Sequence, residues 1–284
     1  MKNKSMKMII MTLVATMTTG LLVGCGGKNE GTNVAPNDTA KTVTIKISGS
    51  TSVGPLMEKQ AEAYKTENSN VTIEVQQIGS SAGIKNAIEG VSEIGMASRE
   101  LKDEEKSSLS ETAIAYDGIG IVTHPSNEVT NLTIEQIKGI YKGAIKNWKE
   151  VGGKDAPIVV VSRDESSGTR DAFQEIVGFK SGELEPSATI ADGNGNVKTT
   201  VANNENAIGY ISFEQFDDSV KALKVEEVEA TPENVVSKTY KLSRPFLVVY
   251  TEKGLTEEGQ KFIDYILSDA GQEIVGKSGG IKVK

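Results

Sequence analysis

Short apolar runs alternate along the chain with longer segments in which apolar residues recur at helical spacing. From residue 43 on, the runs "VTIKIS" (43–48) and "VTIEVQQI" (71–78) flank "PLMEKQAEAYK" (55–65), where apolar side chains fall three or four positions apart. Compact apolar runs indicate strands, and spacing of three to four residues indicates helices. This order predicts an α/β fold in which helices cover a parallel sheet.

The same alternation continues to the end of the sequence. Further strands are predicted at 93–98, 158–162, 207–213 and 244–251. Helices are predicted at 84–90, 134–141, 171–178, 197–204, 257–269 and 271–279. No repeat with the period of a solenoid is present in the sequence.

The first 24 residues have a different pattern. Three lysines precede an uncharged apolar stretch, and small residues then lead to Cys25. This is the pattern of a secretory signal peptide, here 1–24. "LLVGC" resembles the lipobox of bacterial lipoproteins, in which the cysteine carries lipid, although a plain signal peptide with an incidental cysteine is an alternative. Residues 25–42 have no apolar period, so we expect the lipidated cysteine and a flexible linker there.

Composition and charge narrow the class of protein. The chain has 284 residues, 37% hydrophobic and 25% charged, which is ample for a packed core of one or two domains. Removing the three signal-peptide lysines from a formal charge of −8 leaves about −11. This balance argues against binding to nucleic acid or to a membrane through a basic face. No later segment has the ~18 apolar residues of a membrane span, so we expect attachment through the lipid only.

Hydroxyl-rich segments follow four of the predicted strands. They are "GSTSVG" (49–54), "GSSAG" (79–83), "ASRE" (97–100) and "SSGTR" (166–170). Each alone is consistent with a simple helix cap or turn. Helix N-termini also present unpaired N–H groups and a partial positive charge, and ligands of open α/β sheets bind at the carboxyl ends of strands. Four such corners together predict a site for an oxyanion.

These segments, together with "AYDGIGIVTHP", "LTIEQIKGIYKG" and "AIGYISF", resemble the phosphate-binding protein of the bacterial phosphate-specific ABC importer, the PstS family. The resemblance runs from residue 43 to the C-terminus and includes the lipoprotein signal. It implies a type II periplasmic-binding-protein fold, with two α/β lobes, two crossover segments and a ligand cleft between the lobes. It also implies a monomer without cofactor that captures inorganic phosphate and delivers it to the permease subunits of an ABC importer. Such a protein is anchored at the outer face of the bacterial cytoplasmic membrane.

The resemblance also suggests how the chain divides into lobes. Lobe one is expected to contain residues 43–123 and 245–284, and lobe two residues 124–244. The crossovers are then "VTHPS" (122–126) and "LSRPF" (242–246). Trp148, the only tryptophan, is expected to pack within lobe two.

The resemblance assigns the contacts with phosphate to the four corners. The matching positions are Ser50, Thr51, Ser52, Ser80, Ser81, Ser98, Arg163, Ser167, Gly168 and Thr169. Well-known members of the family have an aspartate after the serine of the third corner, which accepts the proton of hydrogen phosphate. This chain has Arg99 there, and we count it among the candidates. Asp117 in "YDG" is the proposed acceptor instead, although an aspartate before glycine is also typical of a turn.

The fourth corner concentrates the charged groups. Arg163 offers a planar fork that matches the edge of a tetrahedral oxyanion. Residues 167–169 offer hydroxyls and a helix N-terminus to the same anion. Either Asp164 or Glu165 is a candidate to orient Arg163. Arg170 is expected to lie on the surface of the helix, with a position in the cleft as the alternative.

Catalysis is the competing class of function. The only histidine, His124, precedes a proline at a predicted crossover, where a structural role is expected. The chain has no "GxSxG" and no lysine three residues after a serine, so the usual activated serines are missing. One histidine and one lipid-bearing cysteine also argue against a metal site. The alternatives are a binding protein for another tetrahedral oxyanion, a surface phosphoester hydrolase, or an adhesin or purely structural surface lipoprotein.

Overall fold

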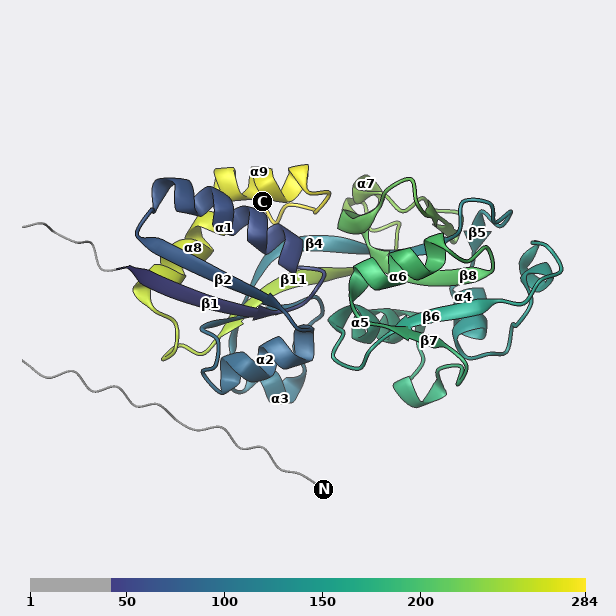
Figure 1. The fold of residues 1–284 in the computed structure, drawn as a ribbon, viewed down its shortest axis with the longest axis horizontal. Coiled ribbons are helices and arrows are strands. Elements are labelled where there is room, and N and C mark those ends of the chain that lie inside the picture. The colour runs from purple at the N-terminus through teal and green to yellow at the C-terminus, as the bar shows by residue number, and fades with distance from the viewer. Residues whose placement is uncertain (1–41) are drawn as a thin grey trace, which may run out of the picture. The chain divides into compact units, whose positions relative to one another are not determined.

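The computed structural model describes residues 42–284, which form the unit shown in Figure 1. The predicted signal peptide, Cys25 and the predicted linker up to residue 41 lie outside the described residues. Within the unit, hydrophobic side chains gather in separate cores, which define two lobes.

Lobe one is built from both ends of the described chain. Its elements are β1 (Val43–Gly49), α1 (Gly54–Glu67), β2 (Val71–Gln77), α2 (Ser80–Ile88), β3 (Ile94–Ala97), α3 (Asp103–Lys106), β11 (Ser243–Tyr250), α8 (Glu257–Ile266), α9 (Asp269–Lys277) and the first part of β4 (Ser110–Thr123). Helices α1, α8 and α9 cover one face of its sheet and α2 covers the other (Figure 1). Apolar strand residues such as Ile45 and Ile47 are therefore buried.

Lobe two contains the middle of the chain and the second part of β4. Its elements are β5 (Asn131–Leu132), α4 (Ile134–Tyr141), β6 (Val159–Arg163), α5 (Gly168–Val177), β7 (Thr189–Ala191), α6 (Gly193–Ala202), β8 (Ala207–Ser212), β9 (Lys221–Ala222), β10 (Lys224–Val225), α7 (Pro232–Val236) and the 3-10 turns at Trp148–Val151, Ser181–Glu183 and Phe213–Gln215. An aromatic group fills its core, with the rings of Phe173 and Tyr210 stacked at 4.1 Å. Trp148 is buried in this core, which confirms its predicted packing role.

Nine strands form one mixed sheet, in which eight follow the order β2-β1-β3-β11-β4-β8-β6-β7 and β9 pairs with β4. Strands β5 and β10 form a separate two-stranded sheet. Strands β1, β2 and β3 are parallel in lobe one, as are β6, β7 and β8 in lobe two. The central strands β4 and β11 run antiparallel to their neighbours. The predicted parallel arrangement is therefore correct for each side of the sheet and wrong at its centre. There the strands that link the lobes are antiparallel to each other and to their outer neighbours.

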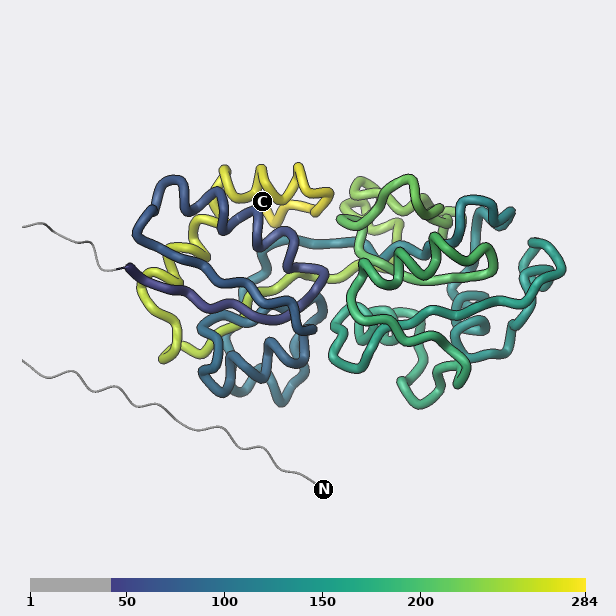
Figure 2. Tube along the Cα trace, viewed as in Figure 1, coloured from purple at the N-terminus to yellow at the C-terminus, as the bar shows by residue number. Residues whose placement is uncertain are grey.

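The link between the lobes lies within strands. Residues 110–118 of β4 pair with β11, whereas residues 119–123 pair with β8 of lobe two (Figure 2). Ile119 and Ile121 accordingly pack in the core of lobe two. The first crossover thus lies before the predicted "VTHPS" segment, because one continuous apolar strand serves both lobes and the proline-containing loop comes after it.

Candidate anion-binding site

Three corners of lobe one lie along one edge of its sheet. Strands β1, β2 and β3 are parallel neighbours, so their carboxyl ends meet at that edge. At the end of β1, Gly49 has φ 145°, and a Cβ there would lie 2.2 Å from the Met96 carbonyl oxygen. Only glycine allows this close turn. The chain then enters α1, and the Ser50 hydroxyl accepts the N–H groups of Ser52 (3.1 Å) and Val53 (3.3 Å).

The second and third corners meet through their serines. The Oγ atoms of Ser80 and Ser98 are 3.3 Å apart, and the Ser98 N–H donates to Ser80 Oγ at 3.2 Å. Both side chains are buried. The neighbouring Ser81 has other partners, since its N–H donates to the Ser166 carbonyl oxygen at 3.1 Å and its Oγ accepts from Arg99 Nη2 at 3.5 Å. Of the two serines predicted at the second corner, Ser80 is the one that contacts Ser98 of the third corner.

The N-terminus of α5 in lobe two faces these serines closely. A Cβ on Gly168 would lie 2.3 Å from Ser80 Oγ and 3.0 Å from Ser98 Oγ, so a glycine is needed for this approach. Ser167 is the N-cap, since its hydroxyl accepts the N–H of Arg170 at 3.2 Å. The first N–H groups of a helix have no partner within the helix. They are therefore available to an anion between the lobes.

Hydroxyls from the two lobes also touch. Ser52 Oγ lies 2.7 Å from Thr169 Oγ1, and Asn194 Nδ2 donates to Ser52 Oγ at 2.9 Å. All three residues are buried. Ser52 belongs to lobe one, whereas Thr169 and Asn194 begin helices of lobe two. The structure thus shows the lobes in contact at the predicted corners.

Arg163 is the charged group of this cleft. It ends β6, it is 1% exposed, and its Nη2 donates to Thr51 Oγ1 at 3.1 Å across the lobes. Its Nε and Nη1 are buried and have no hydrogen-bond partner among the described residues. Burial lowers the pKa of Arg163, and the Asp164 carboxylate opposes this effect. A buried guanidinium with two unpaired donor nitrogens is costly unless an acceptor completes it.

The neighbours of Arg163 resolve two predictions. Asp164 Oδ2 lies 3.6 Å from Arg163 Nη2, whereas Glu165 is exposed, so Asp164 is the carboxylate that lies beside the guanidinium. Arg170 was predicted on the helix surface, and this prediction is wrong. It is 5% exposed, and its Nη1 donates to the Arg163 carbonyl oxygen at 2.9 Å. The first turn of α5 packs back onto the end of β6, which buries the Arg170 side chain.

Asp117 lies beneath the cleft in a buried ion pair. It stands opposite Arg244 in the pairing of β4 with β11, and its Oδ2 is 2.8 Å from Arg244 Nη2. Its Oδ1 accepts the Ser212 hydroxyl at 3.0 Å. Burial raises the pKa of Asp117 to about 6, although Arg244 acts in the opposite direction. A turn is not its role, because Asp117 lies within a strand.

The sequence did not point to Arg244, Ser212 or Asn194. The Ser212 N–H donates to Asn194 Oδ1 at 3.3 Å, so hydrogen bonds run from Asp117 through Ser212 and Asn194 to Ser52. Burial lowers the pKa of Arg244, Asp117 opposes this, and the charge of Arg163 adds to it. Two signals could have found these residues: "DGNGN", a further glycine-rich helix start, and an arginine inside the apolar run "SRPFLVV".

Arg99 is the predicted site residue that the structure directs elsewhere. Its Nε donates to Asp171 at 3.0 Å, and its Nη1 and Nη2 donate to Glu105 at 2.7 and 2.8 Å. Nη1 also donates to the Glu100 carbonyl oxygen and Nη2 to Ser81 Oγ. All of its nitrogens therefore have acceptors within the protein. The third corner also lacks the helix start that was expected directly after residues 97–100, because α3 begins only at Asp103.

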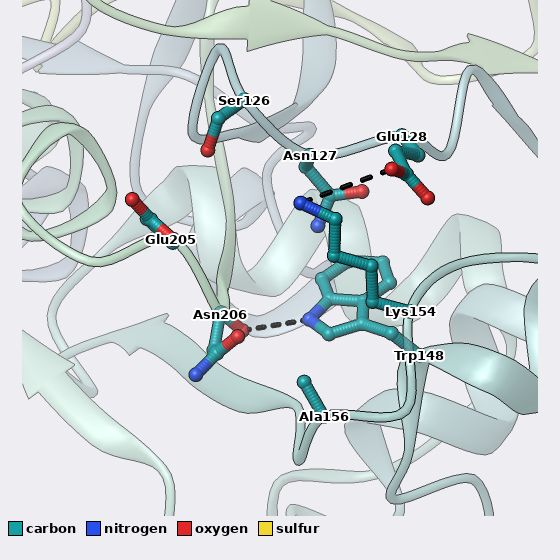
Figure 3. Close-up of a pocket in the computed structure, with 8 residues that line it drawn as sticks. All are labelled: Ser126, Asn127, Glu128, Trp148, Lys154, Ala156, Glu205 and Asn206. Carbon is teal, nitrogen blue, oxygen red and sulfur yellow. Dashed lines mark hydrogen bonds and ion pairs between the residues drawn. The ribbon is translucent and has the colours of Figure 1, made fainter.

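Other features of residues 42–284 lie apart from this cleft. A pocket at Trp148 contains none of the predicted anion-binding residues (Figure 3), and the indole Nε1 there donates to the Asn206 carbonyl oxygen at 3.0 Å. His124 Nδ1 lies 2.7 Å from Ser126 Oγ in a turn. Within this range, no cluster of three or more His, Cys, Asp or Glu side chains is arranged to hold a metal ion. None of its helices is both long and apolar enough to cross a membrane.

Two lobes that meet at hydroxyl-rich strand ends are typical of a class of binding proteins, and comparison with known proteins agrees. A model of the PBP superfamily domain matches residues 34–270, so the chain belongs to the PBP superfamily. The phosphate-binding protein PstS of Borreliella burgdorferi is 31% identical over 98% of this chain and 100% of its own length. The chain is a member of the PstS family.

Solved structures support the same placement. A phosphate ABC transporter substrate-binding protein from Clostridium perfringens, solved with bound phosphate, is 66% identical with a TM-score of 0.84. The match covers 85% of this chain and all of that one. An ABC-type phosphate transport receptor from Vibrio cholerae is 40% identical with a TM-score of 0.73, over 84% of this chain and 99% of its own.

Proposed function

We propose that this chain captures inorganic phosphate between its lobes and delivers it to the permease subunits of an ABC importer. The observation that carries the proposal is Arg163, a buried guanidinium at the lobe contact with two nitrogens that have no acceptor among residues 42–284. A tetrahedral oxyanion supplies paired acceptors of the right geometry for such a fork. The α5 N-terminus and the surrounding hydroxyls supply further donors.

Delivery to an importer follows from the family. The relatives from Clostridium perfringens and Vibrio cholerae are a phosphate ABC transporter substrate-binding protein and an ABC-type phosphate transport receptor. Membership of the same family supports the same role here. We expect a monomer, because the site is assembled by two lobes of one chain.

The phosphate contacts that we propose come from both lobes. From lobe one they are Ser50, Thr51, Ser52, Ser80 and Ser98, and from lobe two Arg163, Ser167, Gly168 and Thr169. Asp117 remains the proposed acceptor of the phosphate proton, held in place by Arg244 and Ser212. Near neutral pH sulfate carries no proton, so a carboxylate beside it would repel its like charge and share no hydrogen bond with it. The alternative ligand is another tetrahedral oxyanion.

Attachment to the membrane is a second part of the proposal. Residues 1–24 are proposed to be a lipoprotein signal peptide and Cys25 the lipidated residue, which leaves the lobes at the outer face of the cytoplasmic membrane. The absence of an apolar period in the segment after Cys25 supports a linker there.

A binding role is favoured over catalysis by the partners of the hydroxyls. Ser52 contacts Thr169 and Asn194, and Ser80 contacts Ser98, so neutral groups rather than a general base accompany them. We propose that the protein acts without a metal or cofactor.

Calorimetric titration of the full chain with phosphate, sulfate and arsenate tests the ligand. The proposal expects tight binding of phosphate, and it expects Arg163→Ala to remove most of that affinity. A chain that binds none of the three anions would contradict the proposal. An assay for turnover of a phosphate monoester accompanies it, and turnover that Arg163→Ala abolishes would favour the hydrolase instead.

A further inference from the structure

An ion-paired group joins the two lobes beside the cleft. Arg99 follows β3 in lobe one, Glu105 lies in α3 of the same lobe, and Asp171 lies in the first turn of α5 in lobe two. Arg99 Nε donates to Asp171 Oδ2 at 3.0 Å, which is a charged hydrogen bond between the lobes. This contact exists only when the lobes are together.

Lobe one holds the guanidinium ready for this contact. Glu105 binds Arg99 through both of its carboxylate oxygens, at 2.7 and 2.8 Å, and the Arg99 side chain is 4% exposed. Burial acts to lower the pKa of Arg99, but the hydrogen bonds and charges of Glu105 and Asp171 outweigh it and raise that pKa. The fork is thus fixed by its own lobe, and one N–H points to the other lobe. Such preorganisation limits the entropy lost when the interlobe bond forms.

The partner in lobe two belongs to the helix that faces the cleft. Asp171 is two residues beyond Thr169, whose hydroxyl meets Ser52, and three beyond Gly168, which packs on Ser80 and Ser98. A neighbouring backbone bond from Ser81 to Ser166 joins the lobes on the same side. A bond to Asp171 therefore holds the N-terminus of α5 against the serines of lobe one.

We propose that Arg99 and Asp171 form an interlobe latch, and that Arg99 is a positioning residue that acts through Asp171 without touching the bound anion. The inference rests on the proposed function and deepens it. Because every Arg99 nitrogen already has a protein acceptor, the latch stabilises the closed arrangement whichever anion is bound. It therefore scales the affinities for different anions by the same factor and acts mainly on the rate of release.

A double-mutant cycle on the full chain tests the latch. Asp171→Asn and Arg99→Gln should each raise the phosphate Kd about five- to tenfold through faster release, as expected for a partly exposed ion pair. The double variant should bind phosphate no more weakly than the weaker single variant, because both substitutions remove the same interlobe bond. The ratio of phosphate to sulfate affinity should stay at the wild-type value in all three, and Asp171→Glu should restore tight binding.

Glu175→Gln is the matched control, since Glu175 is exposed one turn further along α5 and its neutralisation changes the net charge equally. It should leave the Kd unchanged. Strictly additive losses, or a changed phosphate to sulfate ratio in Arg99→Gln, would overturn the latch and assign Arg99 to the anion itself.

X-ray scattering separates the latch from the proposed function. Without phosphate, Asp171→Asn should have a larger radius of gyration than the wild type, and Glu175→Gln should not. Equal radii in all three proteins would contradict the latch. Failure of the wild type to bind phosphate would contradict the proposed function alone, since the scattering comparison needs no ligand.

Discussion

The two sides of the cleft each present a buried arginine, and the two arginines differ in what remains free. In lobe one, Arg99 donates to Glu105, Asp171, Ser81 and the Glu100 carbonyl group. In lobe two, Arg163 donates to Thr51, and its Nε and Nη1 have no acceptor in the part of the chain that the structure describes. Position near a cleft therefore does not identify an anion ligand. Unpaired donors at the contact between the lobes are the better indication, because an unsatisfied buried charge requires a partner. The Nε and Nη1 of Arg244 are also unpaired among residues 42–284, but the charge of Arg244 is paired with Asp117.

The two lobes also differ in the other donor groups that they present to an anion. Lobe one offers neutral donors at three strand ends, and its Arg99 is neutralised by acids of both lobes. Lobe two offers an open guanidinium and a helix N-terminus at one corner. We infer that lobe two recognises the charge of the anion, and that closure adds the neutral hydroxyls of lobe one.

The largest expected effect is that of Arg163→Ala. Loss of a buried, charge-assisted contact typically costs about 2 to 5 kcal/mol, or roughly 30-fold or more in the phosphate Kd. Arg170→Ala should cost far less, because Arg170 contacts the Arg163 backbone rather than the anion. Calorimetry of both variants decides between them. Equal, small losses would remove Arg163 from the site.

Selectivity should respond to Asp117. We expect the wild type to bind phosphate at least about a thousandfold more tightly than sulfate, which is ~4 kcal/mol. Asp117→Asn should narrow this gap chiefly by admitting sulfate, and Ser212→Ala, which keeps the charge, should preserve it. Titration of each protein with both anions measures the ratio. An unchanged ratio in Asp117→Asn would transfer the role to another carboxylate, with Asp164 next.

Glu214 is a partly buried acid with one buried, unpaired oxygen. Glu214 Oε1 has no partner among the described residues and lies where a Cβ on Gly280 would be 3.3 Å away. Burial, and then the charge of Asp117, raise the pKa of Glu214 to about 9. A carboxyl group whose pKa is higher in the folded than in the unfolded state contributes fully to stability below its unfolded pKa. This contribution is lost as the pH rises through the pKa of the folded state.

Glu214→Gln should therefore flatten the pH dependence of stability. Between pH 7 and 9, the free energy of unfolding of the wild type should fall relative to that of the variant by up to about 1.4 kcal/mol per pH unit. Denaturant titrations at several pH values measure the difference, with exposed Glu175→Gln as the control. Parallel curves for wild type and Glu214→Gln would show that Glu214 is ionised in the folded protein.

The smallest effect on binding is expected outside both lobes. Cys25→Ala should release the protein from the membrane fraction and leave the phosphate Kd unchanged, because the proposed linker separates the anchor from the cleft. Fractionation and calorimetry measure the two properties. A variant that stays with the membrane as tightly as the wild type would show that Cys25 is not the anchor.

Local patterns predicted much of this fold. The helix expected at 134–141 forms as Ile134–Tyr141, because its apolar spacing and the Thr133 cap agree. The four corners were also visible, since glycine and hydroxyls at strand ends have a local cause. The double pairing of β4 was not visible, because it depends on which strands lie beside it.

The charged groups of the site were harder to predict for the same reason. Four arginines occur in the sequence and all are at most 5% exposed. Sequence alone does not distinguish the free fork of Arg163 from the filled fork of Arg99, because Asp171 and Glu105 reach Arg99 only after folding. The burial of Arg170 likewise follows from the packing of α5 on β6.

A crystal structure of the chain with phosphate tests the central claim most directly. The account predicts the anion between the lobes, with Nε and Nη1 of Arg163 and the N-terminus of α5 within hydrogen-bond distance of it. Arg99 should remain bound to Glu105 and Asp171 in the same crystal. Phosphate bound to Arg99, with the Arg163 nitrogens still unpaired, would contradict the account.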